Sequence, residues 1–308
     1  MCEILCIVLT GFLFFRGKVL DNAGVRGLTG LTINLFLPCL IFSHLIKNFN
    51  YFNSQYWWLY PVLGVVVSGV GFITARLLLA FDRKITQQKE FTCLVAFQNC
   101  GYLPLILAGS IFPAEISRQL FIHIFLFIQG FNLIFWSVGF QLLKPGEKLR
   151  YELKKIINPP FIALLISLIL ILSRGRVFIP GSVLRSVELV GACTLPVALI
   201  SLGAILAGSL APVQGGERRF IVKAVIGKLV IMPVIFMGVV SFVPLPKLMA
   251  LLLIIEAAMP SAVNLSVLAF YQKTKSKIVS QVVLVTHICG LLTIPVFIGL
   301  YLAFMASP

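Results

Sequence analysis

The feature that most constrains this chain is a succession of apolar stretches joined by short connections. Most are about as long as a helix that crosses the ~30 Å hydrocarbon core of a bilayer. Backbone groups in lipid must form hydrogen bonds within their own segment, and continuous apolar runs are not the alternating strands of a membrane barrel. We therefore expect an all-α polytopic membrane protein with ten transmembrane helices. The ten spans cover approximately residues 2–15, 27–47, 57–81, 90–111, 120–143, 159–173, 184–210, 220–243, 247–270 and 278–304.

The composition supports this class. The chain of 308 residues is 59% hydrophobic and 11% charged, whereas a soluble globular domain carries about 25% charged residues. The net charge of +15 comes from small basic clusters between apolar runs, so we do not expect nucleic-acid binding. The seven cysteines form no metal-binding pattern, and no ATP-binding motif occurs. We expect no cofactor and no metal.

An enzyme is the first competing class. Intramembrane hydrolases need paired carboxylates, an HExxH helix, or a serine with a base on a neighbouring helix. The chain has no HExxH motif and no aspartate inside an apolar span. Ser43 and His44 are adjacent in sequence, so on a helix they face different directions. We do not expect catalysis.

The basic residues predict the orientation in the membrane. Eighteen of the 25 Lys and Arg residues lie in the connections after spans one, three, five, seven and nine, and six lie on the other side. Since basic loops stay in the cytoplasm, both termini are expected to be extracytoplasmic in the plasma (inner) membrane. The longest connection begins KPGEKLRYELKK at Lys144. After it, Asn158 followed by Pro159 and Pro160 predicts the start of the sixth span.

The second and seventh spans carry a matching motif. NLFLPCLIFSHLI and CTLPVALISLGAI both have Leu-Pro followed by a serine five positions after the proline. Pro38 is 66 residues before Pro104 in the fourth span, and Pro196 is 64 residues before Pro260 in the ninth. The chain therefore divides into residues 1–150 and 151–308. Each part has five spans, and an odd number inserts the second copy upside down. We predict a 5+5 inverted repeat.

The fourth and ninth spans contain residues that interrupt a helix in mid-membrane. Such breaks free backbone N–H and C=O groups, which favour anions and cations respectively. A proline kink satisfied by neighbouring helices would explain one such span. Two spans related by the repeat, each with an asparagine, favour a substrate-binding site. Its predicted residues are Asn99, Gly101, Pro104, Pro260, Ser261 and Asn264.

Two ionisable residues lie deep within apolar spans. Lys228 and Glu256 are each some 12–14 Å from a membrane surface at ~1.5 Å per residue, so their depths are similar. Glu256 either holds a coupling proton or cation, or forms a structural ion pair with Lys228. The three histidines, His44, His123 and His287, are dispersed over three spans, and we interpret them as structural.

The chain resembles the auxin efflux carrier family, which includes plant auxin transporters and bacterial permeases for malate-like acids. The resemblance covers nearly the whole chain and depends on the order of NLFLPCLIF, FQNCGYLPL, NPPFIALLIS, TLPVALISLGAILAG and AMPSAVNLSVLA. It implies a scaffold half and a mobile half, with helices 4 and 9 crossing at Pro104 and Pro260. It also implies that a substrate carboxylate sits near Asn99.

We therefore predict a secondary transporter that moves a small organic anion, malate-like or aromatic, by alternating access. Its partners would be the carboxylate substrate, a coupling proton or sodium ion, and membrane lipids. The sequence leaves both a monomer and a homodimer as alternatives. One alternative is a cation-coupled symporter of the bile-acid-transporter type. Another is a receptor or sensor that keeps the fold and binds without transporting.

Overall fold

The computed structural model describes residues 2–49, 56–82, 85–143, 157–208, 217–271 and 276–306. These segments are helical and contain one isolated β-bridge. The basic connection from Lys144 to Lys155 lies outside them, as do Arg83, Lys84, Lys273 and Lys275. Within the described segments, six helices are long and apolar enough to cross a membrane: Asn22–Asn48, Leu59–Ala80, Ala114–Leu143, Gly181–Gly208, Arg218–Phe242 and Lys277–Phe304. The all-helical membrane class is thus confirmed.

The chain folds into two compact units. The first comprises Met1–Tyr60, Gly101–Gln129 and Leu153–Gly208, and the second comprises Pro61–Cys100, Gly130–Glu152 and Ser209–Pro308. Each unit therefore draws on both residues 1–150 and residues 151–308.

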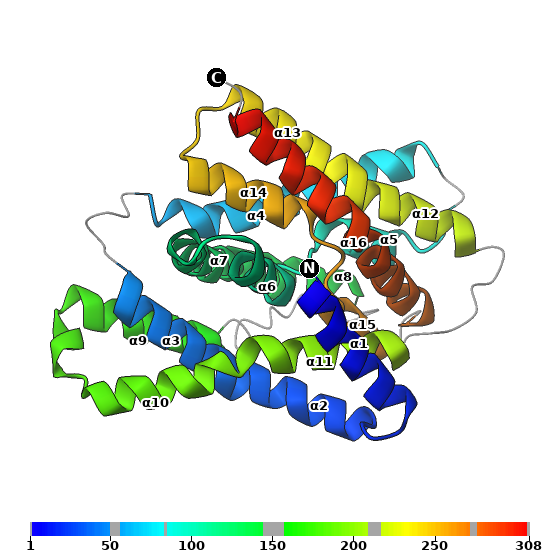
Figure 1. Ribbon diagram of the computed structural model, residues 1–308. Helices are drawn as coiled ribbons and strands as arrows, with labels where there is room; N and C mark the ends of the chain where they lie inside the picture. Colours follow the sequence, from blue (N-terminus) through cyan, green and yellow to red (C-terminus); the bar gives the residue numbers. More distant parts are fainter. Residues whose placement is uncertain are drawn as a thin grey trace. The chain divides into compact units, whose positions relative to one another are not determined.

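The first unit is built from helices that pack in pairs. α1 packs on α11, and α3 packs on both α9 and α10 (Figure 1). Its elements are α1 (Cys2–Arg16), α2 (Asn22–Leu31), the π-helical turn η1 (Thr32–Phe36), α3 (Leu37–Asn48), α6 (Tyr102–Ile111), the first part of α7 (Ala114–Ile134), α9 (Pro159–Leu172), η5 (Gly175–Phe178), α10 (Gly181–Ala192) and α11 (Thr194–Gly208). As predicted, the Asn158 side chain caps α9 by accepting a hydrogen bond of 3.0 Å from the N–H of Phe161.

Glycines let these helices approach backbone to backbone. A Cβ atom added at Gly203 of α11 would lie 1.9 Å from the carbonyl oxygen of Val8 in α1. One added at Gly191 of α10 would lie 2.7 Å from the backbone nitrogen of Leu40 in α3. Small residues at the contact allow close van der Waals packing, which drives helix association in lipid where the hydrophobic effect is missing.

The second unit is organised around the long helix α16 (Ser276–Ala306), which packs against α12, α14 and α15 (Figure 1). In the same unit α13 packs on α14, and α5 packs on α8 and α12. The other elements are α4 (Leu59–Ala80), α5 (Gln88–Ala96), the end of α7, the π-helical turn η3 (Phe135–Gly139), α8 (Phe140–Leu143), α12 (Arg218–Ile226), the π-helical turn η7 (Gly227–Ile231), α13 (Met232–Phe242), α14 (Lys247–Ala258) and α15 (Val263–Tyr271).

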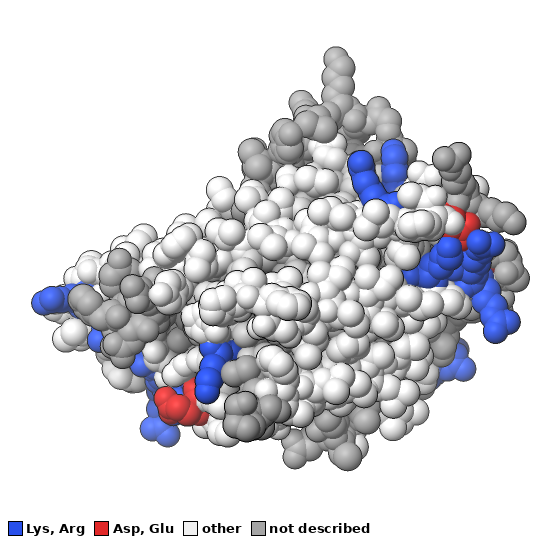
Figure 2. All heavy atoms as spheres, turned by 90° about the horizontal axis from the view of Figure 1, so that it is seen from above, with Lys and Arg blue, Asp and Glu red and all other residues white. Residues whose placement is uncertain are grey.

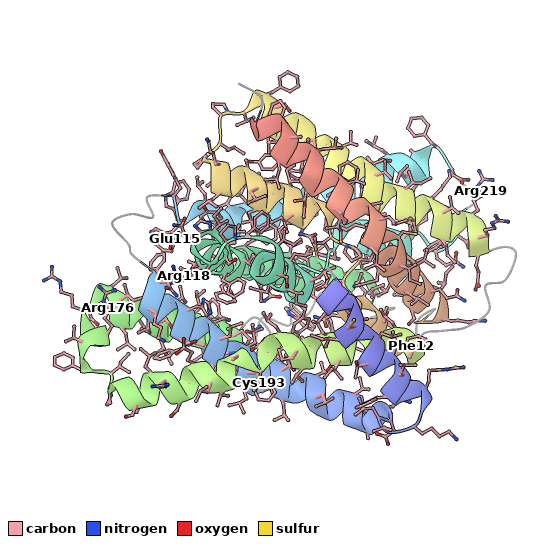
Figure 3. The ribbon with its side chains drawn as sticks, in the orientation of Figure 1. Phe12, Glu115, Arg118, Arg176, Cys193 and Arg219 are labelled. Carbon is pink, nitrogen blue, oxygen red and sulfur yellow. The ribbon has the colours of Figure 1, made fainter. Side chains whose placement is uncertain are left out.

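Charged side chains gather in a few clusters, and most of the face in Figure 2 carries none. In the second unit the buried carboxylate of Asp82 accepts hydrogen bonds from Arg219 Nε at 2.5 Å and from Lys223 Nζ at 2.7 Å. Arg219 lies at the start of α12 (Figure 3). In the first unit Lys47 of α3 pairs with Glu188 of α10 at 2.5 Å.

Candidate functional site

Two helices of the second unit end in short extended segments that pair with each other. α5 ends at Ala96 and α14 ends at Ala258. Gln98 and Ser261 form an antiparallel bridge. The N–H of Asn99 donates to the carbonyl of Pro260 at 2.8 Å, and that of Ala262 donates to the carbonyl of Phe97 at 3.0 Å. Backbone groups freed by the two helix ends thus satisfy one another, as a buried backbone requires.

The C-terminal carbonyls of α5 have side-chain partners. The Ser261 hydroxyl donates to the carbonyl of Leu94 at 2.7 Å. The ammonium of Lys228, on the π-helical turn η7, donates to the carbonyl of Val95 at 3.2 Å. A cation at this position also complements the negative end of the helix dipole. Lys228, which is fully buried, therefore caps α5.

Glu256 is fully buried on α14, two residues before the helix ends. Among the residues that the structure describes, the ion pairs do not include Lys228 with Glu256. The Gln98 amide lies beside the Glu256 carboxylate. Even so, the four side-chain oxygen and nitrogen atoms of this pair find no well-formed hydrogen bond in the described segments. Such a group in a native interior calls for an explanation, because each unsatisfied atom costs about 1–3 kcal/mol.

Among the predicted site residues, Asn99 forms a side-chain hydrogen bond with a histidine of α16. Its side chain is 6% exposed, and its Nδ2 lies 3.2 Å from Nε2 of His287 on α16. Nδ1 of His287 lies 2.8 Å from the carbonyl oxygen of Val283. Next to His287, the Thr286 hydroxyl accepts from the N–H of Ser261 at 3.3 Å. α16 therefore holds both members of the crossing.

The structure brings some of the predicted site residues together. Asn99, Pro260 and Ser261 meet at the crossing, and all three are buried. Asn264 follows in the first turn of α15 with an exposed side chain. Gly101 and Pro104 belong to the first unit, where Gly101 precedes α6 and Pro104 is buried within it.

Sequence analysis missed Gln98, Thr286 and His287 as members of this cluster. Gln98 directly precedes Asn99, so the Gln-Asn pair itself is a signal that could have found it. His287 is 188 residues from Asn99. No spacing rule connects them, because the contact depends on how α16 packs.

Comparison with known proteins gives the family. A model of the family described as "Membrane transport protein" matches residues 1–298. An uncharacterized transporter of Methanothermobacter thermautotrophicus is 26% identical over 307 residues, which cover 96% of this chain and 95% of that protein. Protein PIN-LIKES 2 of Arabidopsis thaliana is 31% identical over 114 residues, 36% of this chain and 25% of that protein.

Another match, an uncharacterized transporter of Schizosaccharomyces pombe, is 25% identical over 47% of this chain and 36% of its own length. The chain thus spans about a third or less of the fungal and plant relatives, and nearly all of the archaeal one. With a family match over almost every residue, this chain belongs to the membrane transport protein family, and its resemblance to the auxin efflux carriers is confirmed.

Proposed function

We propose that this transporter carries a small organic anion by alternating access and binds it at the crossing of Phe97–Cys100 with Met259–Ala262. The observation that carries the proposal is the position of Asn99, whose amide lies within a crossing of two interrupted helices. The N-terminal end of α15 follows the crossing, and helix N-termini favour anions. The amide and the helix end suit a carboxylate.

Helix packing supports the ten-span, 5+5 inverted repeat. α1 with α11 joins the first predicted span to the seventh, and α9 with α3 joins the sixth to the second. Exchanging the two halves converts one pair into the other, as an inverted repeat requires. Both motif-bearing spans also change helical geometry just before Leu-Pro, at η1 in one and at Cys193 in the other.

We further propose that Glu256 carries the coupling proton or cation. The pairing of Lys228 with Val95 leaves the carboxylate without a salt-bridge partner in the described segments, beside the equally unsatisfied Gln98. Carboxylate and amide oxygens are the ligands that a small hard cation prefers. A sodium gradient, a proton gradient or the membrane potential would then drive transport.

The plasma membrane and extracytoplasmic termini complete the proposal. The ion pairs of Asp82 with α12 and of Lys47 with α10 support the order of the spans, because each joins elements whose ends are expected on the same side of the membrane. The orientation itself is inferred from the distribution of basic residues.

A thermal-shift screen of carboxylates on purified protein tests the binding step, because a ligand that binds the folded state raises the unfolding temperature by mass action. We expect malate-like or aromatic carboxylates to stabilise the protein, while the matching uncharged amides do not. Flux of the stabilising anion into proteoliposomes then separates a carrier from a receptor. A protein that no carboxylate stabilises would contradict the anion site.

A further inference from the structure

Both ring nitrogens of His287 take part in hydrogen bonds. These bonds determine which nitrogen carries the hydrogen in the neutral ring. The carbonyl of Val283 only accepts, so Nδ1, 2.8 Å away, carries the hydrogen. In the neutral ring Nε2 is then an acceptor, and Asn99 Nδ2 donates to it at 3.2 Å. The amide oxygen of Asn99 consequently faces away from the ring.

This orientation is poorly suited to holding a carboxylate. An anion needs N–H donors, and in the neutral state one of the two N–H groups of the Asn99 amide is directed at His287. A protonated imidazole donates from both nitrogens. Asn99 would then turn its amide by half a turn, accept from Nε2 with its oxygen, and free its NH₂ group to bind an anion.

We infer that His287 takes up one proton together with the transported anion, and that this proton reverses the Asn99 amide into its anion-binding orientation. The inference rests on the proposed function, in which the anion is held at Asn99. The proton comes from the aqueous side to which the site is open. It stays on Nε2 while the anion is bound, so the two cross the membrane as a neutral pair.

The surroundings of His287 supply no resident counter-charge. α16 packs against α5, α12, η7, α14 and α15. Within the described segments, none of the titratable groups on these elements forms an ion pair with His287. These groups are Lys89, Glu90 and Cys93 on α5, Arg218, Arg219 and Lys223 on α12, Lys228 on η7, and Lys247 and Glu256 on α14, with Lys277, Cys289 and Tyr301 on α16 itself.

A buried imidazolium without a paired carboxylate is costly. An incoming anion would supply the missing charge. Proton uptake and anion binding therefore favour each other by the same factor.

The test measures the Kd of indole-3-acetate and of L-malate between about pH 6 and pH 8, where histidine titrates and both carboxylates stay ionised. The Kd is expected to fall by about tenfold for each unit that the pH is lowered. In His287→Gln the Kd should no longer depend on pH, because an amide offers Asn99 a donor or an acceptor at any pH.

Two variants serve as controls. His123→Gln removes a half-buried imidazole of the first unit, which stacks on Tyr60 with ring centroids 4.0 Å apart, and should keep the pH dependence. Glu256→Gln, at the other proposed proton carrier, separates the two assignments: the pH dependence persists if His287 holds the proton, and its loss would assign the proton to Glu256 instead. A wild-type Kd that does not change with pH, or a dependence that survives in His287→Gln, would overturn the inference.

A second measurement does not depend on the variants. Adding the anion to wild-type protein in weakly buffered solution should remove one proton from the solution for each anion bound, and no uptake would overturn the inference. Anion binding without proton uptake leaves the proposed function intact. Failure of both anions to bind at any pH would instead contradict the proposed anion site.

Discussion

The ammonium of Lys228 donates to the carbonyl oxygen of Val95 at 3.2 Å, and so joins the π-helical turn η7 to the C-terminal end of α5. The membrane-embedded lysine thus fixes a helix end at the crossing. This contact changes the expected behaviour of its variants, because a structural ion pair with Glu256 would be repaired by neutralising both partners.

Lys228→Met should lower the free energy of unfolding by about 1–3 kcal/mol, because the carbonyl of Val95 loses a buried donor. The exposed Lys277→Met, at the start of α16, serves as the control and should have little effect. Thermal unfolding of the purified variants measures both.

The double variant Lys228→Met/Glu256→Gln should stay destabilised, because it does not restore a donor to Val95. Recovery of wild-type stability in that double variant would show that charge balance with Glu256 is the larger contribution.

The features that could be predicted from the sequence are those that depend on neighbouring residues along the chain. Apolar length gave the all-helical membrane class, and the Asn-Pro-Pro stretch gave the start of α9, where Asn158 caps the helix. α5 ends at Ala96 and α14 at Ala258, close to Asn99 and Pro260, while the broken spans of a ten-span repeat stay a prediction.

The side-chain partners at the crossing could not be predicted in this way, because they are far apart in the sequence. Lys228 and Val95 are 133 residues apart, so no local pattern connects them. Similar depth in the membrane suggested Glu256 as the partner of Lys228 instead. His287 was interpreted as structural because the three histidines are dispersed over three spans. Its proximity to Asn99 exists only after α16 packs on the crossing.

Asn99→Ala should weaken anion binding by about 1–3 kcal/mol, because the carboxylate and His287 both lose a partner. Asn34→Ala is the matched control, since Asn34 lies on another predicted span and its side chain donates to the carbonyl of Gly30 at 2.8 Å, within its own helix. Titration of the stabilising carboxylate measures both affinities. Equal affinity in a folded Asn99→Ala variant would move the anion site away from the crossing.

Glu256→Gln should still bind and exchange substrate but lose its response to an imposed sodium gradient. The physical reason is that the neutral amide lacks the charge that binds the coupling cation. Glu188→Gln, which removes an exposed carboxylate paired with Lys47, should keep the response. Uptake into proteoliposomes with and without a sodium gradient makes the comparison, and sodium-driven uptake by Glu256→Gln would remove the coupling role.

Gly203→Leu should destabilise the first unit, because any side chain at Gly203 meets the carbonyl of Val8 and forces α11 away from α1. We expect a loss of about 1–3 kcal/mol or more, as for other overpacked contacts. Gly238→Leu is the control, since a Cβ atom there would meet nothing within 4 Å. Similar unfolding temperatures for the two variants would mean that the α1–α11 contact is not close in the membrane.

Both termini should be extracytoplasmic, given eighteen basic residues on the opposite side against six. In a variant whose seven native cysteines are replaced, Pro308→Cys should react with an impermeant thiol reagent applied to intact cells. Val19→Cys is the control from the other side. Val19 is 70% exposed in the turn between α1 and α2, a connection that the basic residues assign to the cytoplasm. Its cysteine should react only after the membrane is permeabilised, and the reverse pattern of labelling would invert the topology.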